Sequence, residues 1–334
     1  MPADIRQVAE LAGVSIATVS HVINNTRYVT DGTKKKVQEA MEALQYKPNS
    51  VARSLRSHKS NTIGLIFPVL PSDTSNFFFA NVAHGVQTKM KQHGYQLLLS
   101  TNSTESVEDE KEQIELFNSK LIDGLILAPA SEELSHLKEI VSNEYPVVFI
   151  DRRARGYEAD CILSDNYMGS YEAVKLLIEK GHRKIGLITG NRGVSTNNDR
   201  VRAYKQALVD YGISYMPGRI IEGRSSFEDG YACGLRMLEQ PDITALFVTN
   251  NILTMGVMGA LQERGIRIPE QMAVIGFDDY DWTRITTPPL TVIRQPSYEL
   301  GEKAAEIMLE RIAKVDKPPQ EYSLPTELIV RDSC

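Results

Sequence analysis

The pattern of apolar and polar positions changes character near residue 61. Before it, apolar residues recur at helical spacing, whereas after it short β-rich apolar runs alternate with amphipathic stretches of helical length. Such alternation predicts parallel sheets covered by helices on both faces, and therefore an α/β class for most of the chain. The expected strands are 62–69, 96–100, 124–127, 146–150, 184–189, 245–249 and 272–277. The expected helices are 79–93, 108–118, 170–180, 199–211, 229–239 and 253–264.

The first 24 residues predict two short helices around a glycine turn. Ile5, Val8 and Leu11 share one face of the first helix, and Gly13 supplies the backbone freedom that a sharp turn needs. Ser15 is suited to cap the second helix, because its hydroxyl can accept from the unpaired amides of the first turn. We interpret the segment as a helix-turn-helix, for which an ordinary α-hairpin at the start of a globular domain is the alternative.

The second helix has an apolar inner face and an outer face without acidic residues. Val19, Val22 and Ile23 follow i, i+3, i+4 spacing and are expected to lie inside. An outer face without acids is what a reader of the DNA major groove requires. Ile16 and Ala17 offer no hydrogen bonds and should favour thymine methyl groups. The expected DNA contacts on and beside this helix are Ser15, Ile16, Ala17, Thr18, Ser20, His21, Asn24 and Arg27.

Charge separates the same two parts of the chain. Residues 1–60 carry nine Lys and Arg against five Asp and Glu, a net of +4, so residues 61–334 carry −10 of the chain's total of −6. A basic head on an acidic body places a polyanion-binding face at the N-terminus. A third helix, with Val37, Met41 and Leu44 at helical spacing, is expected to close a small three-helix core. The lysine run at 34–36 by itself indicates only a solvated face.

A second DNA-binding signal follows Pro48. This proline ends the preceding helix, and Asn49 or Ser50 can cap a new one of about two turns, which is too short to be stable in isolation. Leu55 lies between Arg53 and Arg56. This arrangement suits a wedge in the DNA minor groove, with Leu55 between base pairs and the arginines on the phosphates. A plain linker with one buried leucine is the alternative. The expected contacts are Ala52, Arg53, Leu55 and Arg56.

Three stretches of the head carry a family resemblance. Residues 5–15 (IRQVAELAGVS), 18–24 (TVSHVIN) and 46–55 (YKPNSVARSL) resemble the head of LacI/GalR-family bacterial transcription regulators, and the resemblance extends over essentially the whole chain. It implies a dimer on a near-palindromic operator, with the short helix after Pro48 ordering only on DNA. For the core it implies the type I periplasmic-binding-protein fold, in which two doubly wound parallel-sheet halves surround a cleft and are joined by three crossing strands.

These considerations predict three parts. They are a helix-turn-helix domain at 1–48, a hinge helix and linker at 49–60, and an effector-binding and dimerisation core at 61–334. The core is expected to divide into two subdomains, approximately 61–161 with 292–322, and 162–291 with 323–334. The chain ends in a strand without a leucine heptad tail, so a homodimer is expected and a tetramer is not.

Polar residues directly follow several expected strands. Ligands of open α/β sheets sit at the carboxyl ends of the strands, so these side chains are expected to converge on one cleft. Carboxylates accept from hydroxyls while Arg and Asn donate, a set that suits a polyhydroxylated ligand. No metal is expected, because the Asp278-Asp279 pair lacks a third carboxylate at a coordinating spacing. Taken singly, Asp151 or Asp165 is more typical of a helix cap or a surface turn than of a ligand contact. The candidates are Asp151, Arg152, Asp165, Thr196, Arg200, Asn250 and Asp278.

The resemblance supports several of these positions. Arg200 begins an Arg-x-x-(Gly/Ala)-(Phe/Tyr) motif, Asn250 lies in an (Ala/Thr)-Asn-Asp motif whose third residue is here Asn251, and Asp278 matches Gly-Phe-Asp-Asp. The segment with Phe77 and Phe78 matches the family segment whose aromatic residue lines the effector site.

Two departures from the family pattern bear on the effector. Purine-binding members place aromatic rings where this chain has Arg152 and Ser225, which disfavours a stacked base. We therefore expect a sugar or sugar derivative, with Ser225 part of its site.

Several classes of protein are disfavoured. There is no apolar run of about 18 residues and no apolar signal region, so a cytoplasmic protein without a membrane partner is expected. Cys161, Cys233 and Cys334 are odd in number and far apart, which is typical of reduced thiols. No GxSxG, HExxH or phosphate-binding loop is present, so neither an enzyme nor a cofactor is expected.

The combined prediction is a sequence-specific repressor of a carbohydrate-utilisation operon, released from its operator by a small sugar-type inducer. The alternatives are a corepressor-dependent repressor with a purine-like ligand, a pleiotropic catabolite regulator, and a solute-binding or sugar-modifying protein whose first 60 residues are incidental. The basic head argues against a separate enzyme, and the lack of a signal region argues against an exported binding protein.

Overall fold

The computed structural model describes residues 3–24, 27–46, 60–72, 77–120, 122–141, 145–240 and 242–334. The chain divides into two compact units, Met1–Ser60 and Asn61–Cys334. The expected hinge residues Ala52, Arg53, Leu55 and Arg56 lie outside the described residues, so the minor-groove wedge stays a prediction.

The described part of the N-terminal unit contains the helices α1 (Ile5–Ala12), α2 (Ile16–Asn24) and α3 (Asp31–Ala43). Asp4 begins α1 by accepting from two amides of the first turn, and Gly13 ends it in the left-handed conformation, with φ of 65°. The hydroxyl of Ser15 accepts from the amide of Thr18 at 3.1 Å, as expected for the cap of α2. The three helices enclose one apolar core of Val8, Ala9, Ala12, Val19, Val37 and Ala40.

Of the three apolar residues expected to share one face of α1, Leu11 does not reach the core, because its side chain is 57% exposed. The inner face of α1 continues from Val8 to Ala9 and Ala12, and in a helix of 3.6 residues per turn Leu11 falls outside that stripe. Val22 and Ile23 pack against the core as expected.

The described residues of the core unit form two six-stranded sheets, one in each subdomain. The first has the order β11-β5-β4-β3-β1-β2 with parallel neighbours, and the second has the order β12-β10-β9-β8-β6-β7, in which β12 runs antiparallel to β10. The first sheet is built from β1 (Thr62–Pro68), β2 (Gln96–Asn102), β3 (Gly124–Leu127), β4 (Val147–Ile150), β5 (Asp160–Ser164) and β11 (Glu321–Leu324). The second is built from β6 (Ile185–Thr189), β7 (Ile220–Glu222), β8 (Ala245–Val248), β9 (Ala273–Phe277), β10 (Thr291–Arg294) and β12 (Glu327–Ile329).

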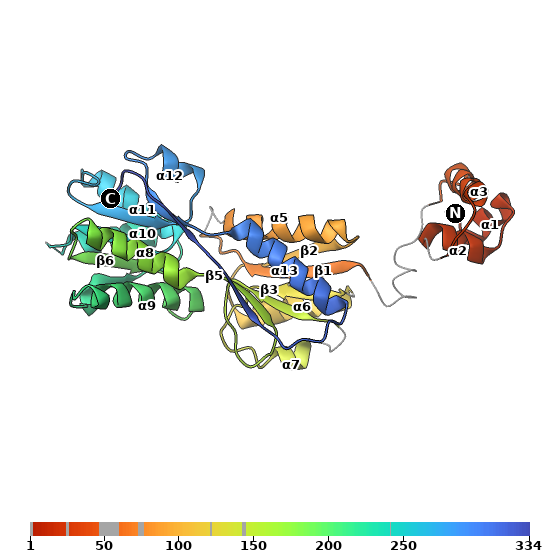
Figure 1. The fold of residues 1–334 in the computed structure, drawn as a ribbon, viewed down its shortest axis with the longest axis horizontal. Helices are drawn as coiled ribbons and strands as arrows, with labels where there is room; N and C mark the ends of the chain where they lie inside the picture. The colour runs from red at the N-terminus through yellow and green to blue at the C-terminus, as the bar shows by residue number, and fades with distance from the viewer. Residues whose placement is uncertain are drawn as a thin grey trace. The chain divides into compact units, whose positions relative to one another are not determined.

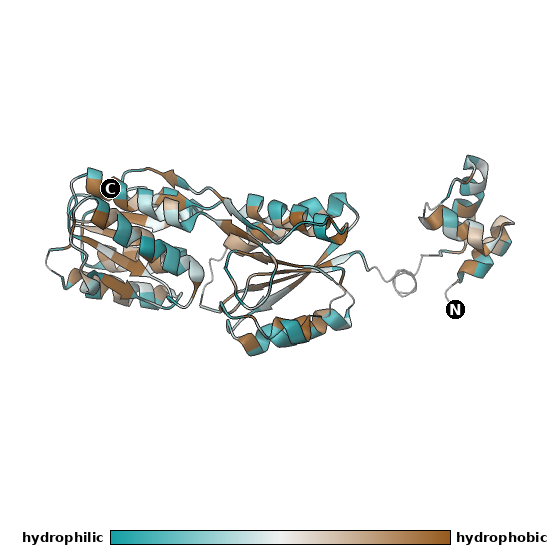
Figure 2. Ribbon diagram, turned by 60° about the horizontal axis from the view of Figure 1, so that its bottom comes forward, coloured by the Kyte–Doolittle hydropathy of each residue, from teal (hydrophilic) through white to brown (hydrophobic). Residues whose placement is uncertain are grey.

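Helices cover both faces of each sheet (Figure 1). In the first subdomain α5 (Phe77–Gln92) and α13 (Ser297–Ile312) pack on one face, and α6 (Val107–Ser119) and α7 (Leu137–Ile140) on the other. In the second, α8 (Asn166–Glu179) and α9 (Ser195–Asp210) pack opposite α10 (Phe227–Leu238) and α11 (Asn251–Glu263). A short helix, α12 (Asp281–Ile285), follows β9. Figure 2 shows hydrophobic strands between helices whose outward faces are hydrophilic, as parallel sheets require.

The chain crosses between the subdomains after β5, β10 and β11. These crossings follow Ser164, Arg294 and Leu324, two or three residues later than the expected boundaries at 161, 291 and 322. β10 therefore belongs to the second sheet, where Thr291 lies opposite Ile275, and the chain returns to the first subdomain after Arg294, close to the approximate bound of 292. The boundary depends on pairing with a strand distant in sequence, which local apolar patterning does not specify.

Two elements that position the site differ from their expected bounds. α8 and α9 each begin four residues earlier than expected, at Asn166 and Ser195. β5 was not among the expected strands, because it opens with Asp160, a buried carboxylate that pairs with Arg311 at 2.6 Å and interrupts the apolar pattern.

Candidate functional sites: a cavity between the subdomains and an exposed helix face

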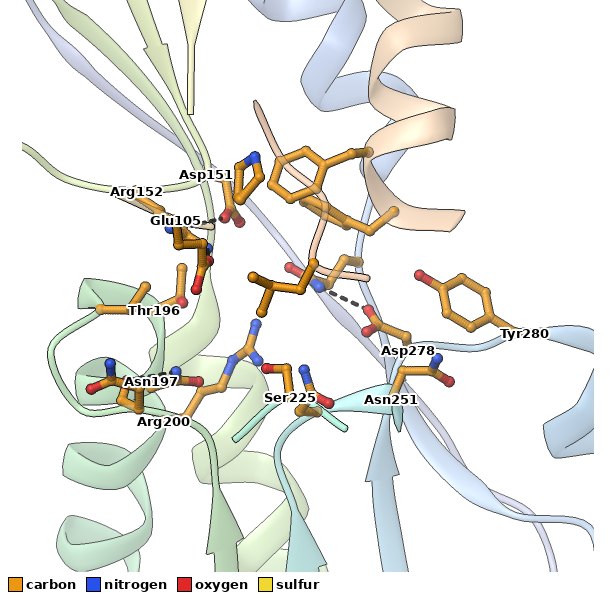
Figure 3. A pocket seen from close by; sticks show the side chains of 18 residues that line it. Glu105, Asp151, Arg152, Thr196, Asn197, Arg200, Ser225, Asn251, Asp278 and Tyr280 are labelled. Carbon is orange, nitrogen blue, oxygen red and sulfur yellow. Dashed lines mark hydrogen bonds and ion pairs between the residues drawn. The ribbon is translucent and has the colours of Figure 1, made fainter. Parts of the chain in front are cut away.

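A cavity lies between the two subdomains at the carboxyl ends of both sheets (Figure 3). Its volume of about 120 Å³ is below the ~300–1,000 Å³ usual for drug-sized ligands, which favours a small occupant. The expected residues that line it are Phe78, Asp151, Arg152, Thr196, Arg200, Ser225, Asn250 and Asp278. Lining residues outside the candidate set are Pro68, Leu70, Phe79, Glu105, Asn191, Val194, Asn197, Asn251, Tyr280 and Gln295. The rule that ligands of open α/β sheets sit at the carboxyl ends of the strands (the strand-end rule) therefore locates the cavity.

Two carboxylates approach the cavity from opposite subdomains. Asp151 follows β4 and is 8% exposed; burial raises the pKa of its carboxyl, and the positive charges of Arg152 and Arg200 partly offset that rise. Asp278 follows β9 and accepts a hydrogen bond from the side-chain amide of Gln295 at 2.8 Å. Both groups are placed to accept from hydroxyl or N–H donors of a ligand.

Arg200 enters from the second subdomain and points toward the centre of the cavity (Figure 3). Its Nε donates to Asn166 at 2.9 Å, Nη1 donates to the carbonyl of Thr249, and the guanidinium lies 3.7 Å from the ring centroid of Phe277. Burial lowers the pKa of Arg200, while Asp278 and Asp151 favour its charged form. Stacking and two protein acceptors fix its plane, so it is pre-positioned toward a ligand.

Glu105 and Arg152 form an ion pair at the first-subdomain wall, with Nη2 of Arg152 at 2.6 Å from Oε1 of Glu105. Nη1 donates to the carbonyl of Pro129 at 3.1 Å, and Nε lies 3.6 Å from a carboxylate oxygen of Asp151. Glu105 was not expected in the site, although it lies in the loop after β2 and the strand-end rule could have included it.

Phe77 and Asp165 do not line the cavity, so these two expectations are corrected. Phe77 is 57% exposed and makes an edge-to-face contact with Tyr280, at 5.4 Å between ring centroids. Because neighbouring residues point about 100° apart on a helix, Phe78 and Phe79 face inward while Phe77 does not. Asp165 caps α8 by accepting from the amide of Met168, which was the alternative considered for it.

Hydrogen bonds join the two subdomains beside the cavity. The Arg153 amide donates to Oγ of Ser195 at 2.9 Å, and the Arg153 guanidinium pairs with Asp199 of α9 and with Glu321 of β11. Ser72 donates to the carbonyl of Ser225 at 2.7 Å. These contacts hold the two walls of the cavity together.

Most of the expected DNA-contacting residues lie on α2 or directly before it, and Arg27 follows the helix. Ser15, Ile16, Ala17 and Arg27 are exposed, and Thr18, Ser20 and His21 are half-buried. Asn24 is the last residue of α2. Ile16 is 47% exposed although it is apolar, so its side chain is available to a partner surface.

Over the described ranges no helix is both long and apolar enough to cross a lipid bilayer. The same residues contain no group of three or more His, Cys, Asp or Glu side chains arranged to hold a metal ion.

A helical head and a core of two α/β subdomains around a polar cavity are features of transcription regulators that combine a DNA-binding domain with a binding-protein-like domain. Residues 4–49 match the profile of "Bacterial regulatory proteins, lacI family", and residues 174–334 match that of a "Periplasmic binding protein-like domain". The HTH-type transcriptional repressor PurR of Haemophilus influenzae (strain PittEE) is 38% identical over 99% of this chain and 98% of its own. The chain therefore belongs to the LacI family and is a DNA-binding transcriptional repressor.

Solved structures agree with this assignment. The lac repressor dimer bound to operator and the anti-inducer ONPF has a TM-score of 0.89 and 26% identity, covering 100% of this chain and 99% of that one. A CelR–cellobiose complex has a TM-score of 0.74 and 27% identity, covering 99% and 100%. A LacI-family regulator of Enterococcus faecium with bound ribose has a TM-score of 0.71 and 26% identity, covering 81% and 98%.

Proposed function

We propose that this repressor binds a near-palindromic operator as a homodimer, with α2 in the major groove, and that a small ligand in the cavity controls the binding. The observation that carries the proposal is the convergence on one cavity of Asp151 and Asp278, from the ends of two strands, and of Arg200, from α9. The exposed face of Ser15, Ile16 and Ala17 supports the role of α2. The lac repressor structure, a dimer on its operator, supports the assembly. We place the protein in the cytoplasm, where its DNA lies.

The ligand that the cavity favours is a neutral monosaccharide or a derivative of it, acting as an inducer. Asp151 and Asp278 can accept from hydroxyls, and Arg200 can donate to hydroxyl oxygens. Ser225 and Arg152 line the cavity without offering an aromatic ring. The volume of about 120 Å³ suits one small ring better than two.

The second candidate is a purine-like corepressor, which would strengthen operator binding. It is favoured by the 38% identity to the repressor PurR over nearly the whole chain. Phe78, Phe79 and Tyr280 also line the cavity and offer aromatic surface from its other sides.

A gel shift on the upstream region of the protein's own gene tests both candidates. The full chain is titrated onto this DNA alone and with a panel of pentoses, hexoses, hypoxanthine and guanine. For a sugar inducer, one sugar should lower the operator affinity at least tenfold while the bases have no effect. Tighter binding with a base would assign the corepressor function instead. Retained affinity with every compound would contradict control by a ligand of either class.

A further inference from the structure

The cavity lining carries more acid than base. Glu105, Asp151 and Asp278 contribute three carboxylates, and Arg152 and Arg200 contribute two guanidinium groups, which gives −1 when all are ionised. A ligand with a phosphate or carboxylate group would add negative charge to a partly buried site that already has an excess of it. The charge balance therefore favours a neutral or cationic ligand.

Each guanidinium group donates to protein acceptors through two of its nitrogens, Arg200 through Nε and Nη1 and Arg152 through Nη1 and Nη2. Arg200 donates to Asn166 and Thr249 and lies over Phe277. The three nitrogens of Arg152 face Glu105, Pro129 and Asp151. An arginine binds a phosphate through a fork of adjacent N–H groups. In Arg152 the two terminal nitrogens of that fork donate to protein, Nη2 to Glu105 and Nη1 to the carbonyl of Pro129.

The carboxylate of Glu105 takes the place beside Arg152 that an anionic group of a ligand would otherwise take. It lies in the loop between β2 and α6 in the left-handed conformation, with φ of 53°. Its side chain is 28% exposed and that of Arg152 is 12% exposed, so Glu105 lies on the solvent side of the pair. An incoming anion would have to displace Glu105 to reach Arg152.

We propose that Glu105 is a specificity-determining residue: by occupying the guanidinium of Arg152 it makes the cavity select neutral ligands and reject phosphorylated or carboxylated ones. The inference rests on the proposed function in treating the cavity as the ligand site. It applies equally to a free sugar and to an uncharged base. Removal of Glu105 should convert Arg152 into an anion-binding group.

Thermal unfolding of the full chain with inorganic phosphate tests this, with chloride at equal ionic strength as the reference. The variants are Glu105→Ala, Glu105→Ala with Arg152→Ala, and the matched control Glu112→Ala, which removes an exposed carboxylate from α6. Glu105→Ala should gain a phosphate-dependent rise in Tm of about 2 °C or more over wild type. The double variant and Glu112→Ala should not gain it.

A second readout covers the case in which Glu105→Ala folds poorly. Glu105→Gln removes the charge and keeps the size, and it should bind phosphate at least threefold more tightly than wild type in calorimetric titration. A wild-type response to phosphate that Arg152→Ala abolishes would overturn the proposal. The proposal would also be overturned if the Glu105 variants responded to phosphate no more than Glu112→Ala. The ion pair of Glu105 and Arg152 would then only support the wall of the cavity. Neither readout uses DNA, so failure of the operator experiment is a separate result.

Discussion

Asp151 and Asp278 occupy equivalent places in the two sheets. Asp151 follows β4 and Asp278 follows β9, both adopt left-handed backbones with φ of 69° and 72°, and both amides donate at 2.8 Å to a carbonyl of the next strand. Those carbonyls belong to Ile162 of β5 and Ile293 of β10. The left-handed conformation is unfavourable for most side chains and is tolerated best by Gly, Asn and Asp. The two subdomains thus present one carboxylate each to the cavity through the same local geometry.

The carboxylate of Asp278 and its left-handed backbone can be tested separately by two substitutions. Asp278→Asn keeps a residue that tolerates the left-handed conformation, so its unfolding free energy should stay near wild type. Its operator binding should no longer respond to the ligand, because the carboxylate acceptor is lost. Asp278→Ala should lose the response and also about 1 kcal/mol of stability. Urea unfolding and the gel shift measure the two effects, and a wild-type ligand response in both variants would contradict the role of Asp278.

The buried carboxyl of Asp151 predicts a pH dependence of stability. Burial raises its native pKa above the ordinary 3.8, so the protonated form is favoured in the native state and the stabilisation is lost as pH rises through the native pKa. Asp151→Asn resembles the protonated form at every pH. It should be more stable than wild type at neutral pH, and the difference should vanish toward pH 3.8. Urea unfolding across this range gives the comparison, and a difference that grows on acidification would have the wrong sign.

Arg153 predicts an effect on ligand affinity from outside the cavity lining. It joins Asp199 of the second subdomain to Glu321 of the first, so Arg153→Ala should weaken the contact between the two subdomains. We expect ligand affinity to fall roughly threefold to tenfold, about 1 kcal/mol, because the pair is partly exposed. Arg202→Ala is the matched control, since Arg202 pairs with the same Asp199 from within α9. Equal losses in the two variants, measured by calorimetric titration, would argue against a link across the subdomains.

The exposed face of α2 predicts base preference. Ile16 is 47% exposed and apolar, so it should contact a thymine methyl group. Ile16→Gln should change which half-site is preferred, with each altered base pair worth about 1–3 kcal/mol, while the head stays folded. Selection from a randomised half-site library measures the preference. An unchanged selected sequence would place Ile16 outside the groove.

The sequence predicts a wedge role for Leu55. If Leu55 enters a base step, Leu55→Ala should weaken operator binding by tenfold or more and leave non-specific binding, carried by Lys and Arg on phosphates, nearly unchanged. The affinities of wild type and Leu55→Ala for operator and for random DNA, measured at one salt concentration, separate specific from non-specific binding. Equal losses on both DNAs would indicate a packing role.

Local features of the sequence were sufficient for much of the fold and site. The capping serine at 15, the left-handed glycine at 13 and the alternation of apolar runs act within a few residues, so helices and strands could be placed from spacing alone. Chain direction within a parallel sheet then brings strand ends together, which located Asp151, Arg152, Arg200 and the other lining candidates.

Only the tertiary structure decided which of these side chains meet. Phe77 and Phe78 are adjacent in sequence, yet helix packing turns one to solvent and the other to the cavity. Glu105 and Arg152 are separated by 47 residues, and their pairing depends on the sheet order that brings β2 and β4 into one subdomain. The crossing after Arg294 likewise depends on the pairing of β10 with β9. Sequence spacing specifies what a residue does within its own element, whereas contacts between distant elements follow from strand order and helix packing, which no local pattern encodes.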